Sequence, residues 1–94
     1  MRLTGAGNEG NRNFFIFDKD NSFQSLFAVF LVNCGFEPGS YENREDICKR
    51  KNLVEHFKND RYDIDVVYTE NRIILIVRTE LKEELNKGIE KMIN

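Results

Sequence analysis

The chain has no tryptophan, one histidine, one proline and two cysteines among its 94 residues. Two cysteines are too few for a disulfide framework, and one histidine beside two thiols makes no cluster of zinc ligands. No apolar run approaches the roughly 18 residues of a membrane-spanning helix, and the N-terminus lacks the apolar stretch of a signal peptide. We therefore expect an intracellular, most simply cytoplasmic, protein with no metal, no cofactor and no membrane partner.

Excess charge of either sign is also missing, because 14 basic and 16 acidic residues give a formal net charge of −2. Such a balance creates no overall field that would attract nucleic acid, so a nucleic-acid binder would need a local basic patch. Hydrophobic residues make up 40% and charged residues 32% of the chain, which is typical of a globular protein. The length fits one domain.

Residues 1–12 are polar and glycine-rich and show no apolar periodicity. They include Gly5-Ala6-Gly7-Asn8-Glu9-Gly10, which matches the G-x-G-x-x-G spacing of dinucleotide-binding loops. That loop requires a strand before it and a helix beginning within it, and this sequence predicts neither. We expect residues 1–12 to be a flexible tail that folding does not need, and residues 13–94 to form a single α+β domain.

Phenylalanine is abundant, and seven of the eight lie between Phe14 and Phe36. The continuous apolar run Asn13–Phe17 is typical of a strand that is covered on both faces, and we expect Phe14 and Ile16 in the core. Apolar residues then recur at helical spacing from Phe23 to Cys34, and the following glycine suits the end of a helix.

The rest of the chain predicts four further elements. We expect a second helix within residues 41–59, a strand with one solvent-facing side at Tyr62–Tyr68, and a continuous apolar strand at Ile73–Val77. A stripe of apolar residues predicts a final helix; it consists of Leu81, Leu85, Ile89 and Met92. The order β-α-α-β-β-α predicts an α+β fold in which a three-stranded sheet packs against helices.

The first helix is apolar around most of its circumference. One stripe of phenylalanines is wide enough to cover the sheet, yet a second arc of Ala28, Val29 and Val32 is also apolar. Another helix could cover this arc, or the arc could be a binding surface, because exposed apolar patches commonly mark interfaces. We favour the second interpretation and predict a non-catalytic interaction or regulatory module. Its partner would be a protein, most simply a second copy in a homodimer.

The alternative function is RNA or DNA binding. On a helix over residues 41–59, Arg44, Lys51 and Lys58 would form one line, extended by Arg61, that could contact phosphates. The order of elements, with Gly35 and Gly39 between the first two helices, also resembles the eukaryotic-type KH domain, in which a Gly-x-x-Gly loop at this place clamps nucleic acid. The loop of this chain is one residue longer than that motif.

Acidic residues raise the question of catalysis. Asp18-Lys19-Asp20-Asn21-Ser22 after an apolar run resembles the first motif of haloacid dehalogenase-type phosphatases, in which the first Asp is a nucleophile and magnesium is required. The chain is too short for the parallel sheet that carries the remaining catalytic groups of that family. We therefore expect a strand exit and a helix cap here, and no enzyme. Asp63 and Asp65 lie two residues apart on one strand face, where alternating acids are ordinary.

Overall fold

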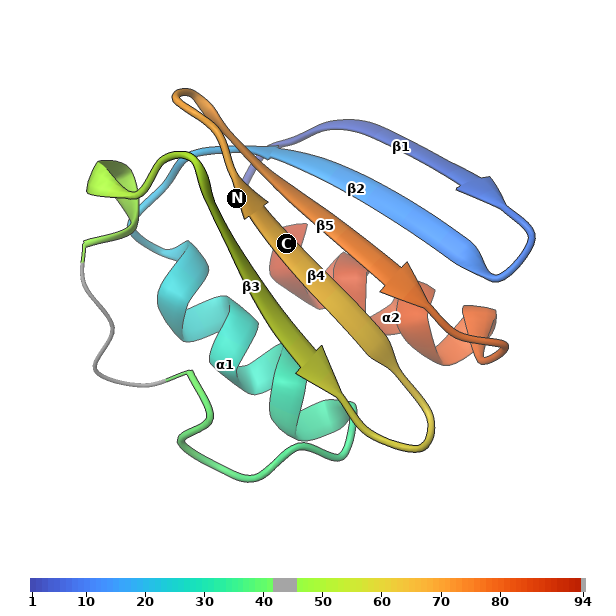
Figure 1. Ribbon diagram of the computed structural model, residues 1–94. Coiled ribbons are helices and arrows are strands. Elements are labelled where there is room, and N and C mark those ends of the chain that lie inside the picture. Colours follow the sequence, from blue (N-terminus) through green and yellow to red (C-terminus); the bar gives the residue numbers. More distant parts are fainter. Residues whose placement is uncertain (42–45, 94) are drawn as a thin grey trace.

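The computed structural model describes residues 1–41 and 46–93, which form an antiparallel sheet with two α-helices packed on one of its faces (Figure 1). The strands follow the spatial order β1-β2-β5-β4-β3. Their bounds are β1 Leu3–Glu9, β2 Arg12–Asp18, β3 Leu53–Lys58, β4 Asp63–Tyr68 and β5 Arg72–Arg78. The helices are α1 Phe23–Asn33, the 3₁₀ helix η1 Ile47–Lys49 and α2 Lys82–Ile93.

The expected three-stranded sheet and the order β-α-α-β-β-α are wrong, because the described residues form a five-stranded sheet. Two edge strands account for the difference. Residues 3–9, within the segment expected to be a tail, pair antiparallel with β2. Residues 53–58, expected within a second helix, pair antiparallel with β4. Only the general α+β class of the prediction holds.

The expected second helix is replaced by a short 3₁₀ turn and an edge strand. Asn52 has a φ of 57°, a left-handed conformation that ends any helical run just before β3. Before it, Arg50 is only 8% exposed, and its guanidinium donates to the Tyr41 hydroxyl at 2.9 Å and pairs with Glu55. Tertiary contacts of this kind override a weak local preference for helix.

The remaining elements confirm the sequence patterns. Helix α1 ends at Asn33, and Gly35 just beyond it has a φ of 90°. The next amide, of Phe36, donates to the Leu31 carbonyl at 3.0 Å. The Leu81 amide donates to the Thr79 hydroxyl at 3.0 Å just before α2. After β2, Asp18 pairs with Arg72 at the strand exit, and Asp20 accepts a hydrogen bond from the Ser22 amide. The expected helix cap is not formed by a side chain, because Ser22 at the N-cap makes no capping hydrogen bond to α1.

The core lies between the sheet and the two α-helices. The largest strand residues in it are Phe17, Ile64, Tyr68, Ile73 and Leu75, and those from the helices are Phe23, Phe27, Phe30, Leu31 and Leu85. On β2 the buried pair is Phe15 and Phe17, so the expectation that Phe14 and Ile16 are in the core is wrong. A strand presents alternate residues to opposite faces, so an error of one position exchanges the two sets.

In the described part of the chain, no helix combines the length and hydrophobicity needed to cross a bilayer.

Candidate functional site

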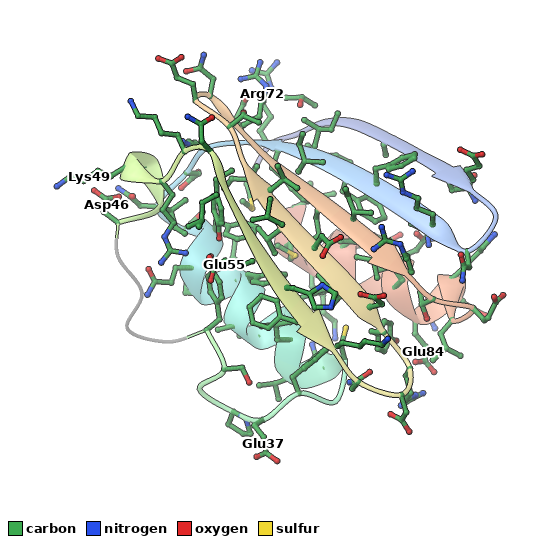
Figure 2. All side chains as sticks on the ribbon, in the orientation of Figure 1. Glu37, Asp46, Lys49, Glu55, Arg72 and Glu84 are labelled. Atoms are coloured by element: carbon green, nitrogen blue, oxygen red, sulfur yellow. The ribbon has the colours of Figure 1, made fainter. Side chains whose placement is uncertain are left out.

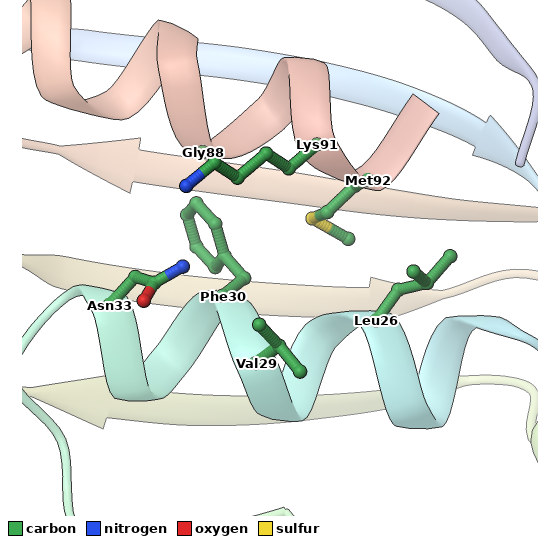
Figure 3. Close-up of a pocket in the computed structure, with 7 residues that line it drawn as sticks. All are labelled: Leu26, Val29, Phe30, Asn33, Gly88, Lys91 and Met92. Atoms are coloured by element: carbon green, nitrogen blue, oxygen red, sulfur yellow. The ribbon is translucent and has the colours of Figure 1, made fainter. Parts of the chain in front are cut away.

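The predicted partner residues lie on the side of α1 that faces away from the sheet. Val29 and Val32 are 58% and 44% exposed, whereas Ala28 is half-buried and packs against the core. Figure 3 shows Val29 at a groove between α1 and α2 that is also lined by Leu26, Phe30, Asn33, Gly88, Lys91 and Met92. The structure therefore places two of the three residues on the solvent side and the third at its boundary.

The groove is small because the two helices touch at its floor. A Cβ atom on Gly88 would lie 3.0 Å from the ring of Phe30, so glycine at this position permits the close approach. The cavity holds about 70 Å³, far less than the roughly 300 Å³ or more of ordinary small-molecule sites. A groove of this size has room for about one side chain and is too small for an ordinary metabolite.

A second apolar surface, which sequence analysis missed, is the sheet face opposite the helices. No α-helix or strand among the described residues lies over it, since both α-helices cover the other face (Figure 1). We call this surface the open face, and its apolar side chains are Phe14, Ile16, Val54, Val67, Ile74 and Ile76.

Two rows of directly opposed residues make the open face continuous. Ile16, Ile74, Val67 and Val54 follow one another across four strands, and Phe14 lies opposite Ile76 in the next row. A solvated sheet face would normally carry polar residues at these positions. The sequence does contain a sign of this surface. The apolar runs Asn13–Phe17 and Ile73–Val77 are continuous, which indicates strands that are apolar on both faces.

Charged residues of both signs border the open face. At one end Arg72 pairs with Asp18 at 3.0 Å, and Figure 2 shows the Arg72 side chain at this end of the molecule. At the other end Arg78 pairs with Asp65 at 3.1 Å. The guanidinium of Arg12 lies 5.0 Å from the centre of the Phe14 ring. The border of the open face therefore carries both positive and negative charges rather than an excess of one sign.

The residues predicted for nucleic-acid binding do not form a helical line. Lys51 lies before β3 and Lys58 is the last residue of that strand, so the two lysines lie at opposite ends of extended chain rather than on one helix face. Lys58 and Arg61 do line one polar groove at the β3–β4 turn, where Arg61 pairs with Glu84 at 3.3 Å. Arg44 lies outside the described residues.

The helix expected within residues 41–59 would not bring His56 together with Asp63 and Asp65. In the structure His56 lies on β3 directly opposite Asp65. Its Nδ1 atom is 2.6 Å from Asp65 Oδ1, and its Nε2 atom is 3.4 Å from Asp63 Oδ1. Partial burial raises the pKa of Asp65, but hydrogen bonds from His56 and Arg78 outweigh it and hold that pKa below its usual value.

No protein-family model, no curated protein and no solved structure matches this chain. Its surfaces and side-chain clusters are therefore the basis for assigning a function.

Proposed function

We propose that this chain is a non-catalytic protein-binding module whose simplest partner is a second copy of itself. The open face carries the proposal, because six apolar side chains lie on a sheet face that no described element covers. A sheet with an apolar face normally buries it against a second layer. Since the helices cover only one side, the second layer is expected to come from another molecule.

A second copy supplies a matching surface for the open face. Two antiparallel sheets with apolar inner faces pack at a separation of about 10 Å, and a twofold dimer uses the same patch on both chains. The bordering pairs, Asp18 with Arg72 and Asp65 with Arg78, contain both signs of charge. Two copies can therefore meet without repulsion between extended regions of like charge.

The exposed arc on α1 is a second surface of the same kind. Val29 and Val32 present apolar side chains to solvent, and the adjacent groove accepts one side chain of a partner. An intracellular, cytoplasmic location is part of the proposal, since Cys34 and Cys48 are both free thiols and a reducing compartment suits them.

Two neighbouring residues on β3 give a matched test of the open face. Val54 and Leu53 are 59% and 45% exposed, and as adjacent strand residues they point to opposite sides of the sheet. We expect light scattering to give a dimer mass for the parent and for Leu53→Lys. We expect a monomer for Val54→Lys, because that substitution buries an unpaired charge in the interface.

The same experiment includes Val29→Glu to test the α1 arc. A folded monomer from Val29→Glu, with a dimer from Val54→Lys, would assign the interface to α1 instead of the open face. A parent that remains monomeric at every concentration would contradict self-association. Circular dichroism on each variant confirms that a change in mass does not reflect unfolding.

Nucleic-acid binding stays the alternative, and the groove at the β3–β4 turn does not favour it. Its cations Lys58 and Arg61 share that groove with acidic residues, which are Asp60, Asp63 and Glu80. Salt dependence separates the two functions, since nucleic-acid affinity falls steeply as salt rises, whereas association through an apolar surface does not.

A further inference from the structure

We propose that His56, Asp63 and Asp65 form a binding site for a zinc-type transition-metal ion on the open side of the β3–β4 hairpin. Each residue offers one ligand atom, and the three atoms all lie within 4.8 Å of one another. The three ligands lie on the same side of the sheet as the open face, and Asp65 is the direct cross-strand neighbour of Ile76, but none of them is one of the six apolar residues that carry the proposed protein-binding function.

The sheet itself positions the three ligands. Asp63 and Asp65 are two residues apart on β4 and therefore point to the same face, and His56 is the direct cross-strand neighbour of Asp65. Backbone pairing holds these strands in register from Leu53↔Tyr68 to Lys58↔Asp63. Side-chain rotations alone can then bring three ligand atoms to the roughly 2.0–2.2 Å at which zinc binds imidazole and carboxylate.

The contacts of the aspartates favour an ion. Asp63 Oδ1 is shielded from solvent yet accepts no hydrogen bond from the described residues, and its contact with His56 Nε2 is a longer ion-pair distance of 3.4 Å. Asp65 uses Oδ1 toward His56, while its other oxygen accepts from Arg78 at 3.1 Å. A hydrogen bond to the oxygen that does not face the ion fixes the orientation of a ligand carboxylate. Two carboxylates also balance the charge of a divalent ion.

The types of ligand select the ion. An imidazole nitrogen with two carboxylates suits zinc and its neighbours in the transition series, whereas magnesium prefers oxygen ligands alone. The His56 side chain is 54% exposed, which leaves the remaining coordination position open to water. Three protein ligands with an open position are characteristic of zinc sites that bind or activate a small molecule rather than sites that only support a fold.

The single histidine makes the site directly observable. Titrating Zn²⁺ alone into the full chain at neutral pH should shift the His56 ring signals in an NMR spectrum and saturate at one ion per chain. Mg²⁺ at the same concentrations should not shift them. Calorimetry should give an affinity that falls by more than about tenfold in Asp63→Asn and in His56→Gln, since changes merely around a metal ligand already cost about 10–100-fold.

Two matched variants guard against unspecific binding. Asp60 is an exposed carboxylate in the same turn, and Cys48 is the exposed thiol; Asp60→Asn and Cys48→Ser should bind Zn²⁺ as the parent does. The proposal is overturned if His56 does not respond to Zn²⁺, which would leave an ordinary ion-pair cluster. It is also overturned if Asp63→Asn binds as tightly as the parent, or if Cys48→Ser abolishes binding.

Discussion

Burial gives the two cysteine side chains of this chain different chemistry. Cys34 is 4% exposed, and burial, with a smaller contribution from the negative charge of Glu84, raises the pKa of its thiol to about 12. Cys48 is exposed on η1. The buried thiol is therefore protonated and unreactive at neutral pH. At alkaline pH, its raised pKa lowers the stability of the fold relative to the unfolded chain.

Replacing the buried thiol should flatten the loss of stability at alkaline pH. The ordinary thiol pKa is 9.0 and the folded value is about 12, so the unfolded chain releases this proton first. The stability that the protonated thiol contributes to the fold is complete below pH 9. It is lost as pH rises toward 12, at up to about 1.4 kcal/mol of unfolding free energy per pH unit. Urea unfolding across this range should show a shallower slope for Cys34→Ala than for the parent. Equal slopes for the parent and Cys34→Ala, or a change in the exposed control Cys48→Ala, would contradict the assignment.

Arg50 is the buried charge that holds the segment before β3. Its guanidinium contacts the hydroxyls of Tyr41 and Tyr68 and the carboxylate of Glu55. Removing one partner of such a buried pair leaves the other charge poorly compensated, so Arg50→Met should lower the free energy of unfolding by about 3 kcal/mol.

Urea unfolding checks this value, with Lys51→Met as the exposed neighbouring control. Adding Glu55→Gln to Arg50→Met should cost less than Glu55→Gln costs alone, because the two groups are coupled. Strictly additive effects would show that Arg50 acts only through its packing.

At the scale of elements, the sequence predicts those whose periodicity is strong and local. The α1 helix, its glycine end and the alternating strand β4 have patterns that need no distant partner. The edge strands β1 and β3 were missed because they carry few buried side chains, and a neighbouring strand supplies their backbone hydrogen bonds. The wrong choice of Phe14 instead of Phe15 as a core residue has a related cause. When a strand is apolar on both sides, its sequence does not show which side faces the core.

Strand β1 gives a prediction at this scale. It is glycine-rich, but it pairs with β2, and a Cβ atom on Gly7 would lie only 3.4 Å from the Phe14 ring. Deleting residues 1–10 should lower the melting temperature by several degrees and increase aggregation, because it exposes the edge of β2. An unchanged melting temperature would instead support a tail that folding does not need. Gly10→Ala tests the β1–β2 turn while leaving the rest of β1 in place. Gly10 has a φ of 62°, a conformation that alanine adopts unfavourably.

The candidate sites emerge only at the scale of the whole molecule. Val29 and Val32 could be singled out from helical spacing, but the open face depends on knowing that both α-helices lie on one side of the sheet. The cluster of His56, Asp63 and Asp65 likewise depends on the pairing of β3 with β4. Contacts between strands are set by topology, which the local sequence pattern does not encode.

The last prediction concerns the coupling of folding to association. If the open face is buried in a dimer, dilution shifts the equilibrium toward unfolded chains, so the melting temperature should depend on protein concentration. A hundredfold range changes the free energy by about 2.7 kcal/mol per dimer, or roughly half of that per chain. For a domain of this size that corresponds to roughly 5–10 °C. Calorimetry should show this shift for the parent and for Leu53→Lys, and a melting temperature independent of concentration for Val54→Lys. A flat response of the parent would mean that the open face is solvated in the free protein and that self-association is not its role.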